Sequence, residues 1–255
     1  MELKQNQVLR DSSLDRVLYG CWLGIPDSNV AEMAASAGFD WLLIDHEHAP
    51  FELADVMAHL RALAPYPVAP VVRPVNNDPA LLKKFLEMGV HTFVIPMIDT
   101  ADQAAACVRA LNYPPKGDRG VGSSLARAAH WGQVDGYLEN ANDEICLIVQ
   151  AETVTAIRNL DAILEVDGVD GVFLGPSDLA ASMGHIGQNT HPDVVESVAN
   201  SLGRIREKGR IAGVLATDAD MIARYRSAGA NFVGVSADTL LVGKAFRDCA
   251  GQFKD

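Results

Sequence analysis

Charged side chains follow four apolar runs of the 255-residue chain, at the points where these runs end. Asp45 and His48 come after one run, and Arg73 closes the next. Two later runs lead to Glu152 and Asp178. Two carboxylates that lie close together either share a proton or bind a cation. Because no cysteine or histidine stands beside this pair, its oxygen ligands favour Mg²⁺ or Mn²⁺ over Zn²⁺.

Each of these residues, taken alone, also has a structural explanation. Asp178 follows Pro-Ser ahead of an Ala/Leu-rich segment and could cap that helix, and Glu152 could be an acid at the start of a helix. Arg73 could pair with a neighbouring carboxylate, and His48 could be a solvated loop residue. Two acids, an arginine and a histidine at four strand ends nevertheless indicate one shared site.

The apolar runs themselves predict eight β-strands. Their apolar character is nearly continuous rather than alternating, which is typical of parallel strands covered on both faces. The predicted strands are Val17–Ile25, Phe39–Asp45, Val68–Pro74, Thr92–Ile98, Ile145–Ala151, Val169–Gly175, Ile211–Ala216 and Asn231–Ser236. Amphipathic segments between them predict helices, among them Glu52–Leu63, Pro79–Met88, Ala101–Leu111, Asp193–Lys208 and Ala219–Ala228. Several such segments end in a glycine that permits a left-handed C-cap, at Gly38, Gly89, Gly209 and Gly229.

Eight strands alternating with helices predict an α/β fold, a single-domain (β/α)8 TIM barrel over residues 1–255, with a doubly wound open sheet as the alternative. No linker divides the chain. In a barrel of this kind the loops that follow the strands converge at one end and carry the chemistry. Glu152 and Asp178 are separated by one strand–helix unit, so neighbouring strands would bring the two carboxylates together.

Two intervals are longer than the repeat requires. A Gly/Pro-rich segment, residues 113–124, precedes the fifth strand, and residues 183–187 precede the seventh. We interpret both segments as loops over a mouth of the barrel. The first has neither the lysine of a P-loop nor the spacing of a dinucleotide fingerprint. We expect Arg119 in this segment, or Arg127 shortly after it, to approach a substrate carboxylate.

The charge balance excludes several classes of protein. There are 33 acidic and 21 basic residues, so the formal net charge is −12, and without a basic run we expect no binding to nucleic acid or to an anionic membrane. The first residues lack the apolar core of a signal peptide, and no stretch approaches the ~20 apolar residues that span a bilayer. The four cysteines are scattered. We therefore expect a cytoplasmic protein with reduced thiols.

The chain resembles the HpcH/HpaI aldolase family of metal-dependent class II 2-oxo-acid aldolases. The resemblance extends over about residues 18–250 and is carried, in the family's order, by LLIDHEHAP (42–50), VRP (72–74), GDRGVG (117–122), QAET (150–153) and GPSDL (175–179). Two positions depart from the family's pattern. His46 stands where a smaller residue is familiar, and Glu87 stands where aspartate is familiar.

This resemblance implies a carbon–carbon lyase that reversibly cleaves 4-hydroxy-2-oxo acids to pyruvate, or hydroxypyruvate, and an aldehyde through a metal-bound enolate. It implies that Glu152 and Asp178 bind the divalent cation, which would be Mg²⁺, Mn²⁺ or Co²⁺. Arg73 matches the residue that contacts the 2-oxo acid, and His48 matches the acid/base histidine. Asp45 lies near that histidine in the family's pattern.

The resemblance also implies a homo-oligomer, a trimer or a hexamer, whose last helix is exchanged between subunits. Glu87 matches an acid that a neighbouring subunit brings beside the histidine. The small-molecule partners would be a 2-oxo acid and an aldehyde. We expect side chains at three strand ends to contact them, namely Gln150, Ser177 and Leu215.

The sequence leaves three alternative functions open. A Schiff-base aldolase needs a lysine inside the barrel, but none of the seven lysines ends a predicted strand. A metal-dependent hydrolase could use His46 and His48, because strand periodicity would aim both at one zinc ion. A non-catalytic ligand-binding barrel would keep the fold without the chemistry.

Overall fold

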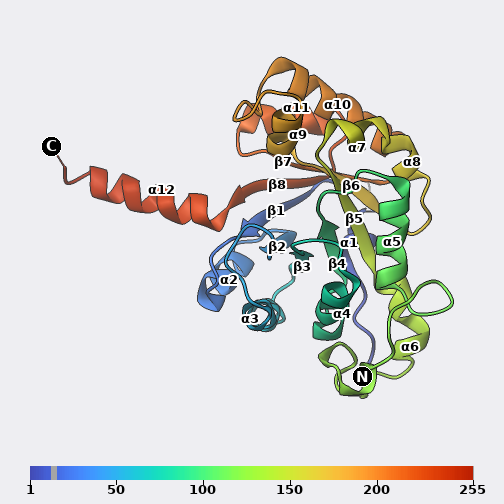
Figure 1. Cartoon of the computed structure of the whole chain (residues 1–255). Helices are drawn as coiled ribbons and strands as arrows, with labels where there is room; N and C mark the ends of the chain where they lie inside the picture. Colours follow the sequence, from blue (N-terminus) through green and yellow to red (C-terminus); the bar gives the residue numbers. More distant parts are fainter. Residues whose placement is uncertain (13–15, 255) are drawn as a thin grey trace.

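Eight parallel strands close into a barrel in the computed structural model, which describes residues 1–12 and 16–254 (Figure 1). Each strand pairs with the next along the chain, and the last pairs with the first. The strands are β1 (Leu18–Leu23), β2 (Trp41–Asp45), β3 (Ala69–Arg73), β4 (Thr92–Ile95), β5 (Cys146–Ala151), β6 (Gly171–Leu174), β7 (Ile211–Leu215) and β8 (Phe232–Ala237). The predicted (β/α)8 barrel is confirmed, and the alternative of an open sheet is wrong.

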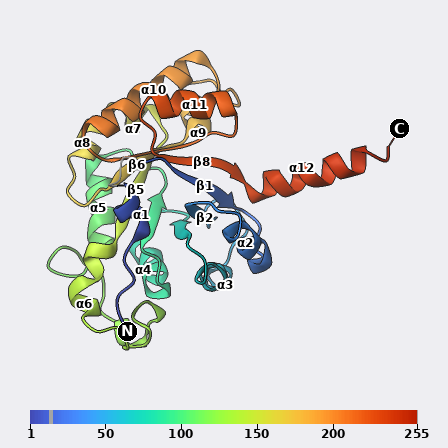
Figure 2. The ribbon, with the colours of Figure 1, turned by 180° about the vertical axis from the view of Figure 1, so that it is seen from behind.

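Helices follow the strands, and all the helices named here except the last surround the barrel (Figures 1 and 2). They are α2 (Ser28–Ala35), α3 (Leu53–Leu63), α4 (Pro79–Met88), α5 (Ala101–Leu111), α7 (Val154–Arg158), α8 (Leu160–Leu164), α9 (Pro176–Ser182), α10 (Pro192–Glu207), α11 (Ala219–Ser227) and α12 (Asp238–Gly251). The five predicted helices are confirmed to within one residue at each end. The four predicted C-cap glycines all have positive φ, between 69° and 112°, the left-handed conformation that turns the chain back toward the next strand.

The barrel is filled by large side chains that form the floor beneath its carboxyl-terminal end. The rings of Trp41 and Phe232 stack with their centroids 4.1 Å apart, and Trp22 packs against Phe173 at 5.4 Å. Gly20 is needed on β1 because a Cβ there would lie 2.0 Å from the indole of Trp41. Because these side chains fill the interior of the barrel, we expect ligands to bind at the ends of the strands.

The amino-terminal end of the barrel is closed by helix α1 (Gln7–Ser12), which the sequence analysis did not predict. Val8 is buried among the side chains inside the barrel. The Asn6 side-chain amide donates hydrogen bonds to the His91 carbonyl at 3.1 Å and to Thr92 Oγ1 at 3.0 Å, at the start of β4. The N-terminal segment is thereby attached to the end of the barrel that lies opposite the strand exits.

The long interval before β5 lies at this same amino-terminal end. Residues 112–145 follow α5, and a helix that follows a strand runs back to the other end of the barrel. The segment contains helix α6 (Tyr137–Asn140) and short 3-10 turns at 123–125, 127–129 and 141–144. It therefore does not cover the mouth that carries the strand exits. The expectation that Arg119 or Arg127 approaches a substrate in the same chain is wrong for this reason.

Helix α12 stands apart from the rest of the molecule. Figures 1 and 2 both show it projecting away from the barrel after β8. Its apolar side chains and those of the following residues are largely solvent-exposed in the isolated chain, at Leu240, Leu241, Phe246 and Phe253. Within residues 1–12 and 16–254, no helix is both long and apolar enough to cross a membrane. All four cysteines are free in this structure, and Cys249 alone among them is exposed.

Candidate active site

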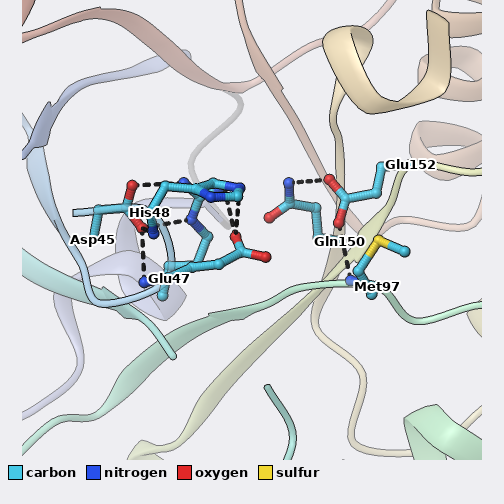
Figure 3. Close-up of polar contacts among 7 residues, drawn as sticks. Asp45, Glu47, His48, Met97, Gln150 and Glu152 are labelled. Carbon is cyan, nitrogen blue, oxygen red and sulfur yellow. Dashed lines mark hydrogen bonds and ion pairs between the residues drawn. The ribbon is translucent and has the colours of Figure 1, made fainter. Parts of the chain in front are cut away.

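The charged residues of the strand exits lie at the carboxyl-terminal end of the barrel, as the fold requires. Asp45 ends β2, Arg73 ends β3, and Glu152 follows β5 directly. Asp178 lies in the first turn of α9, after β6. Figure 3 shows the residues from the exit of β2 facing those from the exit of β5 across this end of the barrel.

Arg73 and Asp45 form a buried, bidentate ion pair between neighbouring strands. Arg73 Nε donates to Asp45 Oδ1 at 2.9 Å, and Nη2 donates to Oδ2 at 2.6 Å. Burial alone would lower the pKa of the Arg73 guanidinium. The hydrogen bonds and charge of Asp45 raise this pKa, as do the charges of Glu47 and Glu152. These effects outweigh burial, so the pKa is raised overall. The arginine therefore stays charged although its own side chain is buried.

Glu47 is a site residue that the sequence analysis missed. Its Oε2 lies 3.1 Å from Arg73 Nη1 and 3.7 Å from His48 Nε2. Burial raises the pKa of this carboxyl, and the negative charges of Asp45 and Asp178 raise it further against the opposing effects of Arg73 and His48. Its position between two histidines at a strand exit was the available sequence signal.

Glu152 is almost completely buried, with 2% of its surface exposed. Its Oε1 accepts a hydrogen bond from the Met97 backbone N–H at 2.9 Å, and its Oε2 accepts one from Gln150 Nε2. Met97 adopts φ 56°, a left-handed conformation that is unusual outside glycine and turns this N–H toward the carboxylate. Burial raises the pKa of Glu152 to about 7, and the charges of Asp178 and Glu47 contribute to the rise against the two hydrogen bonds.

The backbone of the β6 exit packs tightly against Glu152. A Cβ on Gly175 would lie 2.6 Å from Glu152 Oε2, so only glycine fits at this position. Gly175 is also the N-cap residue of α9, which makes the interpretation of Asp178 as an N-cap wrong. Asp178 instead raises the pKa of both Glu152 and Glu47, so these three carboxylates share one electrostatic environment.

The two histidines of the β2 exit lie in different surroundings. The His46 ring packs edge-on against Phe85, 5.2 Å away, and its buried Nδ1 has no hydrogen-bond partner among the described residues. His48 is 68% exposed and points toward Glu47. The two rings therefore do not converge, which removes the support for a hydrolase that uses both. All seven lysines are exposed, so none lines the barrel as a Schiff-base aldolase would need.

Glu87 is not beside His48 within one chain. It lies in the last turn of α4, at the amino-terminal end of the barrel, and its Oε1 is 3.1 Å from Arg119 Nη2. The guanidinium of Arg119 lies over the ring of Tyr113 at 4.1 Å and donates to the Tyr137 hydroxyl at 3.1 Å. Among the described residues, Glu87 Oε2, Arg119 Nε and the Tyr113 hydroxyl are buried without hydrogen-bond partners.

The remaining predicted residues line the same end of the barrel as Glu152. Gln150 is buried at the end of β5, and its Oε1 has no partner among the described residues. Ser177 is exposed beside Asp178. Leu215 lines a cavity of about 110 Å³ together with Pro176, Asn189 and Thr190, the last two from the loop that follows α9.

Comparison with known proteins identifies one family of aldolases and lyases. The sequence profile of HpcH/HpaI aldolase/citrate lyase matches residues 18–245. A hydroxypyruvate/pyruvate aldolase of Pseudomonas aeruginosa is 48% identical over 254 residues, which cover all of this chain and 95% of that protein. A 4-hydroxy-2-oxo-heptane-1,7-dioate aldolase of Escherichia coli is 49% identical over 92% of this chain and 89% of its own length. The crystal structure of a protein of the matched family from Burkholderia cenocepacia superposes with a TM-score of 0.93 at 38% identity, covering 98% of this chain and 100% of that one.

Proposed function

This chain belongs to the HpcH/HpaI aldolase/citrate lyase family and is a carbon–carbon lyase, and from that premise we propose that it reversibly cleaves 4-hydroxy-2-oxo acids to an aldehyde and pyruvate or hydroxypyruvate. The observation that carries the proposal is the group of carboxylates around Arg73 at the strand exits (Figure 3). Burial, and after it the charges of Asp178 and Glu47, raises the pKa of Glu152 to about 7, and perturbed carboxyl groups of this kind are frequent in functional sites.

We propose that Glu152 and Asp178 hold a divalent cation at this position. Hard oxygen donors suit Mg²⁺, Mn²⁺ or Co²⁺, and the ion would offset the repulsion that the clustered carboxylates exert on each other. When bound, the cation supplies positive charge beside the oxygens of the 2-oxo acid. Glu47 contributes negative charge to the same region, since its charge acts on the pKa of Glu152.

Arg73 is suited to bind the 2-oxo group of the substrate. Two of its five N–H groups donate to Asp45, and Glu47 Oε2 lies 3.1 Å from Nη1, so the plane of the guanidinium is fixed. N–H groups that do not donate to Asp45 would be available to a substrate oxygen, where they would stabilise negative charge that develops as the bond breaks.

His48 is the proposed acid/base group. In cleavage the imidazole accepts the proton of the C4 hydroxyl, the C3–C4 bond breaks, and the C4–O bond becomes the carbonyl of the aldehyde. The electron pair of the broken bond passes into the enolate of the 2-oxo acid, whose C3 then takes up a proton. Exposure of His48 and its contact with Glu47 are compatible with proton exchange at the mouth.

We propose further that the active enzyme is a homo-oligomer in which α12 packs on another copy of the chain. The exposed Leu240, Leu241 and Phe246 would be covered in that arrangement, which removes apolar surface from water. The neighbouring copy would also supply Glu87 to His48. Light scattering should find an oligomer for the natural chain and smaller species for Phe246→Asp, whereas Met33→Asp, at an exposed position on α2, should leave the assembly unchanged.

A coupled assay for pyruvate release tests the proposed reaction. The natural chain is incubated with Mg²⁺ or Mn²⁺ and a panel of 4-hydroxy-2-oxo acids that differ in the aldehyde portion, with lactate dehydrogenase and NADH as the reporter. The assay is repeated in the synthetic direction with pyruvate or hydroxypyruvate and an aldehyde. Turnover of at least one substrate supports the proposal, and no turnover of any substrate in either direction would contradict it.

A further inference from the structure

We propose that His185, His191 and Asp193 form a second metal site, which takes a divalent transition metal such as Zn²⁺, Ni²⁺ or Co²⁺. His185 lies in the loop after α9, His191 is the N-cap residue of α10, and Asp193 lies in the first turn of α10. None of the three is among the carboxylates of the proposed aldolase site. One ligand atom from each of the three lies within 4.8 Å of those of the other two. The site would bind an ion whether or not the proposed aldol chemistry is correct.

The distances are close to those of a metal polyhedron. His185 Nε2 and His191 Nδ1 each lie 3.8 Å from the same oxygen, Asp193 Oδ2. Bond lengths of ~2.0–2.1 Å from zinc to nitrogen or oxygen put tetrahedral ligand atoms about 3.3 Å apart. Binding therefore requires each of these two separations to shorten by about 0.5 Å, which changes of side-chain torsion can supply.

The two imidazoles are already held against each other. Their rings stack with centroids 3.6 Å apart and planes 12° from parallel. The backbone fixes both ends of the loop, because the His185 N–H donates to the Ala180 carbonyl at 2.7 Å and the His191 N–H donates to the Gln188 carbonyl at 2.9 Å. Parallel rings do not aim both lone pairs at one point, so one ring must turn about its Cβ–Cγ bond, a soft torsion.

His191 Nδ1 acts as an acceptor in the metal-free chain, since it receives the Asp193 backbone N–H at 3.3 Å. That hydrogen bond is long and would be exchanged for a metal bond. The Asp193 side chain is 66% exposed, so water can complete the coordination. Three protein ligands with an open position are the arrangement of many zinc sites.

The ligand atoms of this site select different metals from those of the proposed aldolase site. Imidazole nitrogen suits Zn²⁺, Ni²⁺, Co²⁺ and Cu²⁺, whereas Mg²⁺ prefers oxygen ligands. A bound ion would restrict the conformations of residues 185–193. This segment includes Asn189 and Thr190, which line a cavity together with Leu215. Because the ion binds the folded chain, we expect it to raise the melting temperature.

Calorimetric titration of the metal-free full chain with Zn²⁺ tests the proposal. The parent carries Cys249→Ser, which removes the one exposed thiol of the four cysteines. His185→Gln and His191→Gln are each compared with His130→Asn, a control at an exposed histidine whose left-handed backbone, φ 45°, asparagine tolerates. We expect each test variant to lose one binding event or at least about tenfold in affinity, because even partners outside the ligand set typically contribute that much.

Two further readouts separate the site from nonspecific binding. The Cu²⁺ spectrum of the parent, recorded by electron paramagnetic resonance, should show coupling to two nitrogens that disappears in His185→Gln/His191→Gln. The Zn²⁺-dependent rise in melting temperature should disappear with it, while Mg²⁺-dependent aldolase activity stays unchanged. Equal Zn²⁺ stoichiometry and affinity in the parent and in both single variants would overturn the proposal.

Discussion

Arg73 and Asp45 stand opposite each other in the register of β3 and β2 and are joined by two hydrogen bonds of 2.9 and 2.6 Å. The two hydrogen bonds to Asp45 fix the orientation of the Arg73 guanidinium at the end of β3. Asp45 thus acts on Arg73 rather than on the His48 ring, and its contact with His48 is to the backbone N–H, at 3.3 Å.

Arg73→Lys tests whether the orientation of the guanidinium by Asp45 contributes to turnover. Lysine keeps the positive charge but cannot form the bidentate pair with Asp45. Loss of one preorganised donor to a developing oxyanion typically costs ~10²–10³ in rate, so we expect kcat to fall by that factor while the fold is retained. Arg127→Lys, at a half-buried arginine that caps the end of α4 through the Met88 carbonyl, is the matched control. Near-native kcat in Arg73→Lys would contradict the role.

Gly175→Ala tests whether the position of Glu152 controls metal affinity. The new methyl group would lie 2.6 Å from Glu152 Oε2 and 3.0 Å from its Cβ, so the carboxylate must move. We expect the Mn²⁺ dissociation constant, measured by calorimetry, to rise at least about tenfold. Gly122→Ala, where a Cβ meets nothing within 4 Å, should leave it unchanged. Equal affinities in the two variants would show that Glu152 does not hold the ion.

The raised pKa of Glu152 predicts how the stability of the metal-free protein depends on pH. The carboxyl has a pKa of about 7 in the folded chain against an ordinary value of 4.5, so between these values the folded state binds more protons than the unfolded state. The free energy of unfolding should therefore decrease as pH rises through this window, by up to about 1.4 kcal/mol per pH unit from this group.

Chemical denaturation of the metal-free natural chain and of Glu152→Gln between pH 4.5 and 8 measures this effect. The variant has no group to ionise at this position, so the difference in stability between the variant and the natural chain should grow with pH and level off above about pH 7. Glu196→Gln, at an exposed position on α10, serves as the control. A difference that is constant across the pH range would refute the assignment.

Complementation between subunits tests the contribution of Glu87. Co-expression of His48→Ala and Glu87→Ala chains creates some sites in which an intact histidine meets an intact glutamate from the neighbouring copy. Random assembly should restore about a quarter of the natural activity if the two residues come from different chains. Co-expression of His48→Ala with Arg73→Ala, whose residues belong to the same site, should restore none. Equal results for both pairs would rule out a site shared between subunits.

The strands and the main helices follow from the sequence because each depends on local composition. Continuous apolar runs such as Phe39–Asp45 can be buried only when both faces are covered, and β2 occupies Trp41–Asp45 within that run. The placement of charged residues at one end of the barrel then follows from the fold. The bidentate contact between Arg73 and Asp45 does not, because it depends on strand register, which apolar composition alone leaves undetermined.

Other features depend on long-range contacts that local patterns do not contain. The apolar residues of α12, such as Phe246, do not indicate by their pattern whether the helix packs on its own barrel or projects away from it, as it does here; only the resemblance to the family implied an exchanged helix. The segment around Arg119 resembles a substrate loop in composition, yet it follows α5 and so lies at the other end of the barrel. The position of Glu47 between two histidines is visible in the sequence, but its contact with Arg73 depends on the three-dimensional arrangement of β2 and β3.

The dependence of turnover on a divalent ion tests the central claim most directly. Pyruvate release from an accepted 4-hydroxy-2-oxo acid is measured after removal of metal by a chelator, and again after Mg²⁺ or Mn²⁺ is restored, for the natural chain and for Glu152→Gln. We predict that chelation lowers kcat by at least about 10², that the ion restores it in the natural chain, and that it fails to do so in the variant. Full turnover of the chelated natural chain would contradict the account.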